Sequence, residues 1–518
     1  MAKDFEPPKI NPWIIATAVM LSTFMEVLDT TVVNVSLPHI AGSMSASVDE
    51  ATWTLTSYLV ANAIILPMTG WLSNHFGRKR ILMTSVTGFT VASFLCGLAP
   101  NLPLLVIFRV IQGACGGGLQ PISQAVLLES FPPEDRGKAM GFWGLGIVVA
   151  PMLGPVLGGW LTDSYSWRWV FYINIPVGIL ALIMTQFFVF DPSYIKRVAG
   201  RIDYWGMGML AVGIGALQIV LDKGQELDWF SSDVITRLAI ICAVALVVFV
   251  IYELVVEHPV VDLRAFKERT YSTGVFLMTI LGFVLYGSLV ILPIFLQTIL
   301  GYPALQAGIA MFPRGLGSFI AMPFVGIIMS RFDPRKLLVI GIVACAFSLV
   351  LLGTLNLNVG YWEIFWAQFL QGLSLGFLFV PLTTVTMDPI PNEKMGNATS
   401  IFNLMRNIGG SMGIALSTTI VARSTQHYTN FLGRNVTPYS PQTRTMFEAL
   451  RGFFMSSGAD AATATQRAYA AMFGMVQRQA AMLSFNHTYL FLAILFIIVM
   501  PAVFLMRRPK SRGRMAAH

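Results

Sequence analysis

Three ionisable side chains interrupt long apolar segments of this sequence. Glu26 and Asp29 lie three residues apart within 13–35, a spacing that places both on one face of a helix, and Arg109 lies within 103–126. A charge inside such a segment costs several kcal/mol unless it is paired or used. Carboxylates beside an arginine can form a proton site, because like charges favour protonation of one acid and the guanidinium opposes it. We therefore predict that Glu26, Asp29 and Arg109 couple proton movement to function; a static ion pair that joins two helices is the alternative.

The composition indicates that these apolar segments lie in a bilayer. Of the 518 residues, 55% are hydrophobic and only 12% are charged, whereas a soluble domain carries about 25% charged residues. The four cysteines lie in apolar runs without metal-ligand spacing, so we expect neither a disulfide framework nor a metal site. The net charge of +8 comes from basic residues near the ends of apolar runs, which indicates topology and not nucleic-acid binding.

The spacing of charged and Pro/Gly breaks predicts an all-α membrane protein with 14 transmembrane helices. Segments of about 20 residues cross the hydrocarbon core of a bilayer, and we place them at 13–35, 52–72, 81–99, 103–126, 139–160, 169–190, 203–221, 234–253, 272–298, 304–329, 337–355, 361–387, 398–421 and 487–506. Lys and Arg gather in alternate loops, which by the positive-inside rule predicts that both termini are cytoplasmic.

A weak internal repeat divides the predicted helices into two halves. Gln112-Gly113 recurs as Gln371-Gly372, 259 residues further along, and Gly70 corresponds to Gly326 at the close offset of 256. Such offsets are typical of parallel six-helix halves in a secondary transporter. We therefore predict a six-helix bundle at 1–200, two inserted helices at 201–254, a second bundle at 255–421 and 487–507, an outer helical loop at 422–486, and a cytoplasmic tail at 508–518.

Polar residues at mid-membrane depth are candidates for a substrate pocket between the halves. The pocket that we predict is lined, among apolar residues, by Glu26, Asn34, Gln112, Tyr286, Gln297, Gln371 and Asn403. Arg314 and Arg406 are weaker candidates, since either could lie near enough to a helix end for its guanidinium to reach the membrane surface.

Glycines and one proline indicate where helices approach closely or bend. Within 139–160, Gly154, Gly158 and Gly159 leave little bulk, and Pro155 removes a helical hydrogen bond, so this helix could slide or bend; static tight packing is the alternative. The hairpin between the second and third predicted helices holds a second group of candidate gating residues, namely Gly70, Asn74, Gly77, Arg78 and Lys79.

The segment 422–486 is too long for a simple connection between two spans. Apolar residues recur there at helical spacing and predict two amphipathic helices, with Asp460 as the cap of the second: Phe447, Leu450, Phe454, Tyr469, Met472, Phe473 and Val476. These apolar faces could pack on each other or form a docking surface for a partner outside the membrane.

Four motifs in order resemble those of a known transporter family. LDTTVVNVSLP at 28–38 looks like the first-span motif of the fourteen-helix drug:proton antiporters, the EmrB/QacA group of the major facilitator superfamily. The segments 70–80, 109–117 and 150–159 resemble the superfamily's loop 2-3, span-four and antiporter motifs. The resemblance implies a major facilitator fold in which Asp29 and Arg109 form the coupling pair. Asn74 stands where the family motif has an aspartate, which argues against a charge relay and leaves a hydrogen-bonded inner gate.

The resemblance further implies a proton-coupled exporter of hydrophobic and amphipathic drugs that works by alternating access. The chain is similar to members from Gram-negative bacteria, which implies a location in the inner membrane. It also implies a periplasmic adaptor as partner and, through it, an outer-membrane channel. Transport would be driven by the proton gradient, without a cofactor. A narrow exporter of one metabolite, such as a fatty acid or siderophore, is the alternative. A membrane-embedded enzyme is disfavoured, because the six histidines are scattered and no nucleophile with a base is seen.

Overall fold

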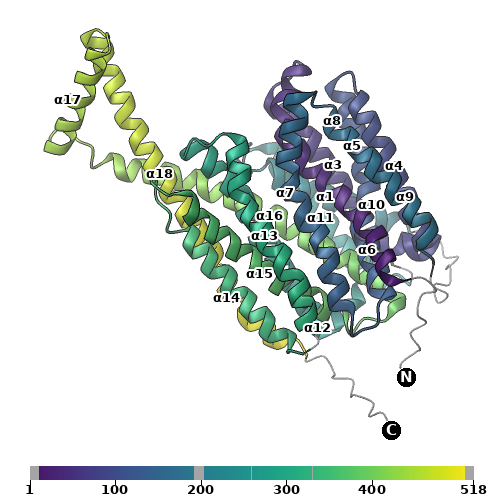
Figure 1. The fold of residues 1–518 in the computed structure, drawn as a ribbon. Coiled ribbons are helices and arrows are strands. Elements are labelled where there is room, and N and C mark those ends of the chain that lie inside the picture. Colours follow the sequence, from purple (N-terminus) through teal and green to yellow (C-terminus); the bar gives the residue numbers. More distant parts are fainter. Residues whose placement is uncertain (1–10, 192–202, 258, 330, 508–518) are drawn as a thin grey trace.

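A computed structural model of the chain describes residues 11–191, 203–257, 259–329 and 331–507, and the described elements are all helical. Figure 1 shows that the described chain starts and finishes at the same end of the helical bundle. We call this end the terminal end. The opposite end, from which one helical hairpin projects, is called the loop end.

Polar caps and glycines set the helix boundaries of the first half. The Asn11 side chain accepts a hydrogen bond from the backbone N–H of Trp13, and Gly77, at φ 96°, allows one helix to follow another directly. The helices of this half are α1 (Pro12–Ser43), α2 (Val48–Ala51), α3 (Trp53–Phe76), α4 (Arg78–Leu98), α5 (Leu102–Gly116), α6 (Leu119–Ser130), α7 (Arg136–Ser164), α8 (Trp169–Tyr172) and α9 (Asn174–Phe188).

Two inserted helices precede the second half. They are α10 (Tyr204–Lys223) and α11 (Asp233–Val255). The second half contains α12 (Arg269–Ile294), which continues as a π-helical turn (Phe295–Ile299), then α13 (Ala304–Ile328), α14 (Pro334–Leu352), α15 (Tyr361–Met387), α16 (Met395–Gly433), α17 (Pro441–Ser456) and α18 (Ala461–Val499).

The two halves repeat the same helix packing. In the first half α1 packs against α7, α3 against α5, and α4 against α9; in the second, α12 packs against α16, α13 against α15, and α14 against α18. The halves meet where α3 contacts α16 and where α13 contacts α7, while α10 packs on both α3 and α16. This arrangement confirms the predicted all-helical fold of two six-helix halves and an inserted pair.

Glycines at mirrored positions permit matching close contacts inside each half. A Cβ atom on Gly113 would lie 2.3 Å from the carbonyl oxygen of Tyr58, and one on Gly372 would lie 1.9 Å from that of Arg314. Gly372 follows Gly113 by 259 residues and Arg314 follows Tyr58 by 256, the two offsets of the sequence repeat. The repeat therefore records a shared requirement for close helix approach, which small residues satisfy.

The count of membrane spans differs slightly from the prediction. Thirteen helical segments of the described chain are long and apolar enough to cross a membrane. The segment that falls short corresponds to the predicted span 398–421, which lies in α16 and packs inside the bundle against α12, α18 and α3. This helix carries buried polar residues, including Asn397, Asn403 and Arg406, which lower its apolar content without removing it from the bundle.

The helical hairpin at the loop end is built on extensions of two bundle helices (Figure 1). The prediction ended the two flanking spans at 421 and 487, but α16 continues to Gly433 and α18 begins at Ala461 and runs into the bundle without a break. The prediction used the drop in hydropathy to end each span. Backbone hydrogen bonding does not depend on hydropathy, so both helices continue beyond the apolar segment. The predicted amphipathic helices correspond to α17 and the first part of α18.

Asp460 caps α18, as its position predicts. Its carboxylate accepts hydrogen bonds from the backbone N–H groups of Ala462 and Thr463, at 3.1 and 3.3 Å. Hydrogen bonds from the side chain and backbone of Thr463 lower the pKa of the Asp460 carboxyl below its ordinary value.

Candidate functional site

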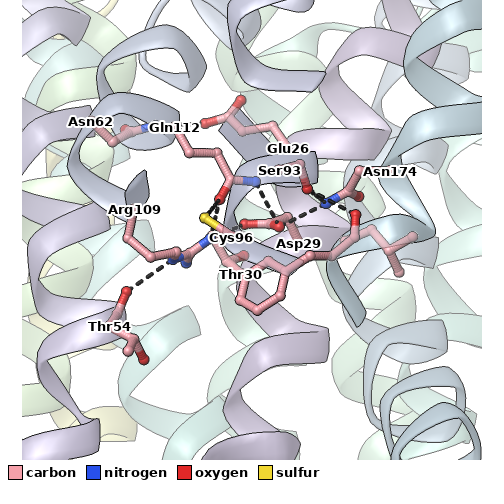
Figure 2. Close-up of polar contacts among 12 residues, drawn as sticks. Glu26, Asp29, Thr30, Thr54, Asn62, Ser93, Cys96, Arg109, Gln112 and Asn174 are labelled. Carbon is pink, nitrogen blue, oxygen red and sulfur yellow. Dashed lines mark hydrogen bonds and ion pairs between the residues drawn. The ribbon is translucent and has the colours of Figure 1, made fainter. Parts of the chain in front are cut away.

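An ion pair between α1 and α5 forms the centre of the candidate site. The Nη1 atom of Arg109 lies 2.6 Å from Oδ2 of Asp29, and neither side chain is exposed (Figure 2). The separation is that of a charge-assisted hydrogen bond. The structure thus brings together two of the three residues in which we predicted the proton site.

Two amides complete the surroundings of the Asp29 carboxylate. Its Oδ1 accepts hydrogen bonds from Nε2 of Gln112 at 2.9 Å and from Nδ2 of Asn174 at 2.7 Å. With Arg109, the three hydrogen-bond partners of Asp29 are all donors, so the arrangement fits the charged carboxylate. We did not predict Asn174; its sequence signal is an amide side chain within the apolar run 169–190, which also contains Gln186.

Further contacts hold the Arg109 guanidinium in place. Its Nε donates to the backbone carbonyl of Thr54 at 2.9 Å, and its Nη1 also donates to Oε1 of Gln112 at 2.7 Å. The guanidinium carbon lies 4.2 Å from the centre of the Tyr58 ring, a cation–π geometry. Figure 2 shows Thr54 and Gln112 beside the Arg109 guanidinium.

Glu26 points away from this ion pair and lines a cavity. Its Oε1 accepts a hydrogen bond from Nδ2 of Asn62 at 2.9 Å, and its Oε2 has no hydrogen-bond partner. Gln120, Arg406 and Asp29 also interact with it. The predicted trio therefore divides into an ion pair, of which Arg109 also lines the cavity, and a separate carboxylate in the cavity wall.

The cavity has a volume of about 340 Å³ and lies between the halves. Its walls come from both halves, and apolar side chains such as Ile147, Leu289 and Phe379 supply much of them. On α3 and α13, which run from the loop end to the terminal end, the lining residues fall within 55–63 and 308–322. The cavity therefore occupies the part of the bundle nearer the loop end.

Three of the seven predicted pocket residues line the cavity: Glu26, Asn34 and Tyr286. The other four lie elsewhere, and their assignment to the lining is corrected. Gln112 is bonded to Asp29, and Gln371 donates to Ser288 at 3.1 Å. Asn403 donates to Gln124 of the other half at 2.5 Å, while Gln297 is exposed at the end of α12. Depth and polarity alone did not separate cavity groups from groups that bond to each other.

Two arginines that we had treated as weaker candidates line the cavity. Arg314 is 5% exposed and Arg406 is 2% exposed, so neither guanidinium reaches the surface. Arg406 donates to Gln120 of the first half, whereas Arg314 contacts only second-half groups. Gln120 and Gln218 are further polar lining residues that the sequence analysis missed.

The halves touch closely at the terminal end, at two mirrored glycines. A Cβ atom on Gly70 would lie 2.6 Å from the Cα of Asn397, and one on Gly326 would lie 2.8 Å from the carbonyl oxygen of Gly137. Arg78 pairs with Glu129 of its own half and also donates to the Asn392 carbonyl across the interface at 3.5 Å. Of the predicted gating residues, Gly70 and Arg78 thus contact the opposite half.

The other hairpin residues predicted to gate make contacts within the first half. The backbone N–H of Lys79 donates to Oδ1 of Asp191 at 2.8 Å, and the same carboxylate lies against Gly77. The Oδ1 atom of Asn74 has no hydrogen-bond partner. In this conformation Oδ1 of Asn74 therefore does not contribute to a hydrogen-bonded gate, and that gate stays a prediction.

The glycines of α7 pack against α1 and not against the other half. A Cβ on Gly154 would meet the Thr31 side chain at 2.1 Å, and one on Gly158 would meet the carbonyl of Val32 at 2.8 Å. Pro155 lines the cavity, whereas nothing lies within 4 Å of a Cβ built on Gly159. These positions join two helices of one half beside the cavity.

Comparison with known proteins identifies relatives over nearly the whole chain. Residues 19–414 match the family profile described as Major Facilitator Superfamily. The chain is 40% identical to "Multidrug export protein EmrB" of Haemophilus influenzae, covering 88% of this chain and 89% of that protein. It is 37% identical to "Fatty acid resistance protein FarB" of Neisseria gonorrhoeae, covering 95% and 96%. The solved proton:xylose symporter XylE is similar in fold, with a TM-score of 0.62 and 15% identity over 96% of each chain.

Proposed function

This chain belongs to the major facilitator superfamily, and from that membership we propose that it is a proton-coupled exporter of hydrophobic and amphipathic compounds. Relatives that are named multidrug export proteins support drug efflux as the task. Membership in a transporter family sets aside the membrane-embedded enzyme considered above. The observation that carries the proposal is the buried Asp29–Arg109 pair next to a cavity between two halves.

Proton coupling follows from the way in which Asp29 is held. Its carboxylate accepts from three donors, which stabilise the charged form, so proton uptake is favoured when one of them, most directly Arg109, moves away. A proton on Asp29 cancels the charge that holds the guanidinium, and the released Arg109 then changes the electrostatics of the adjoining cavity. Glu26, which faces the cavity, tunes this exchange or meets cationic substrates.

Alternating access accounts for the position of the cavity. We take the terminal end as cytoplasmic and the loop end as periplasmic, in the bacterial inner membrane, in keeping with the basic residues of the inner loops. The cavity then lies toward the outside, while the glycine contacts of Gly70 and Gly326 close the inside. In the opposite state these contacts part, and substrate enters from the cytoplasm or inner leaflet.

Substrate-induced proton release in detergent tests the coupling site. Wild type is expected to release protons when a drug binds, and Asp29→Asn, which keeps the shape and one accepting oxygen but has no titratable group, is expected to bind drug without releasing any. Glu26→Gln serves as the matched variant with the cavity-facing acid removed. Undiminished release from Asp29→Asn together with loss from Glu26→Gln would transfer the proton site to Glu26.

We further propose that α17 and the adjoining part of α18 dock a periplasmic adaptor, which connects to an outer-membrane channel. The support is a projecting hairpin with large exposed aromatic groups, among them Tyr439 (87% exposed), Phe453 and Tyr469. Shortening this hairpin should abolish resistance in cells and leave transport in proteoliposomes intact. Equal loss in both assays would assign the hairpin to the transport unit itself.

A narrow exporter of one metabolite is the second candidate. The relative named as a fatty acid resistance protein favours it, as do Arg314 and Arg406, which lie in the cavity wall in addition to Arg109. A transport screen with purified protein in proteoliposomes separates the candidates: export of several unrelated drugs supports the broad exporter, and export of a single compound class supports the narrow one.

A further inference from the structure

The second half carries a buried cation that no acid neutralises. Arg314, on α13, is 5% exposed and lines the cavity. Its Nη2 atom makes two long contacts, to the Leu285 carbonyl at 3.3 Å and to Oγ of Ser288 at 3.5 Å, and its Nη1 atom has no hydrogen-bond partner. Within the described residues no ion pair includes it.

The groups around Arg314 supply no negative charge. The titratable side chains that interact with it are Cys345 and Tyr489, both neutral groups in ordinary conditions. A guanidinium in an apolar site needs a partner, because burying an unpaired charge is costly. Two long contacts to neutral oxygens do not satisfy its five N–H donors.

The charges that line the cavity sum to an excess of positive charge. Arg109 is paired with Asp29, and Arg406 lies near Glu26 through Gln120, whereas Arg314 has no counterpart. The cavity is otherwise apolar, with residues such as Phe312 and Leu289 near the same wall. A ligand that fills this space would bury an apolar body and present one negative group to Arg314.

We propose that Arg314 is the anchor for the carboxylate, or a similar planar anion, of amphipathic substrates. The guanidinium fork matches a carboxylate in geometry and charge, and its buried Nη1 atom has no hydrogen-bond partner that a ligand would have to displace. The inference rests on the proposed export function and names its substrate class. Arg314 is a specificity-determining residue, and Glu26 on the opposite wall would select against a second negative charge.

Three naphthalene probes of matched shape test the assignment. Binding of 1-naphthoate, 1-naphthalenemethanol and 1-naphthylmethylammonium to the full chain in nanodiscs is measured by calorimetry. Wild type is expected to bind the carboxylate at least about tenfold more tightly than the alcohol. In Arg314→Gln this preference should disappear, and Arg314→Lys should retain part of it because the charge remains.

The control is Arg423→Gln, which removes an exposed arginine farther along α16, outside the cavity lining, and should keep the full preference. No preference in wild type, an undiminished preference in Arg314→Gln, or tightest binding of the ammonium probe would each overturn the proposal. Proton-driven export of a neutral drug in proteoliposomes distinguishes failure of this inference from failure of the proposed export function. If export occurs without a carboxylate preference, only this inference fails; if the preference is present but no compound is exported, the proposed function fails.

Discussion

The two halves share a polar frame but differ in the charge that it holds. In the first half, Gln112 donates to Asp29 at 2.9 Å; in the second, Gln371 donates to Ser288 at 3.1 Å. Each of these second-half residues follows its counterpart by 259 positions. The same hydrogen-bond geometry is therefore kept with a hydroxyl in place of a carboxylate.

The cation differs in the same way. Arg109 donates to Gln112 at 2.7 Å, and the residue 259 positions later, Gln368, donates to Gln371 at 3.3 Å. Because the fold forms this frame with neutral groups in one half, helix packing does not require charges in the other. The comparison therefore supports the proposed chemical role of the Asp29–Arg109 pair over a purely structural one.

Converting the first-half pair to the second-half residues is the strongest test. The double variant Asp29→Ser/Arg109→Gln is expected to fold, since the second half folds with that set, and to lose proton-driven uphill transport by at least about 100-fold, because no titratable group remains in the frame. Size-exclusion chromatography tests whether the double variant folds, and transport in proteoliposomes under a pH gradient measures the loss of uphill transport. Retained uphill transport would break the comparison.

Removing the buried cation of the first half should lower the free energy of unfolding more than removing the neutral side chain at the corresponding position of the second half. Arg109→Gln leaves the fully buried Asp29 carboxylate without its counter-ion, and such a loss costs about 3–5 kcal/mol in the free energy of unfolding. Gln368→Ala in the second half removes a neutral group and should cost about 1–3 kcal/mol. SDS titration compares the two, and equal losses would mean that the charge of the first-half pair has no special weight.

The mirrored glycines between the halves should respond alike. Gly70→Ala and Gly326→Ala each place a Cβ under 3.0 Å from backbone atoms of the other half, so closure at the terminal end should be disfavoured by about 1–3 kcal/mol. Distances between spin labels at the two ends report the shift toward opening at the terminal end. Gly159→Ala, with nothing within 4 Å of its new Cβ, is the matched control. Opposite responses of the two glycine variants would show that the interfaces are not equivalent.

The halves differ most in the connection between their last two long helices, and the smallest expected effect concerns this connection. α7 and α9 are joined by a short link containing α8, whereas α16 and α18 carry the long hairpin with α17. In intact, outer-permeabilised cells, Ser440→Cys should react with an impermeant thiol reagent, because the hairpin is proposed to lie outside. Arg80→Cys at the terminal end should stay protected. The reverse pattern would invert the proposed orientation.

Local features of the sequence were sufficient for the fold and for part of the site. Composition and the spacing of charges predict helices in a bilayer, and the offsets of 259 and 256 predict two related halves. Glu26, Asp29 and Arg109 are conspicuous because each is a charge within an apolar run. Hydropathy was less reliable for α16, whose polar residues face other helices of the bundle.

Partners and directions of side chains were decided only by tertiary packing. The sequence has no feature that distinguishes Arg314, which faces the cavity, from a residue whose side chain reaches the membrane surface, because the distinction depends on the rotation of α13 against α12. Asn403 and Gln371 have the polarity of pocket residues, yet each is bonded to another buried group. Asn174 joins Asp29 from a helix 145 residues later. The type and depth of a residue are local properties, whereas the group that it meets is set by how the helices pack.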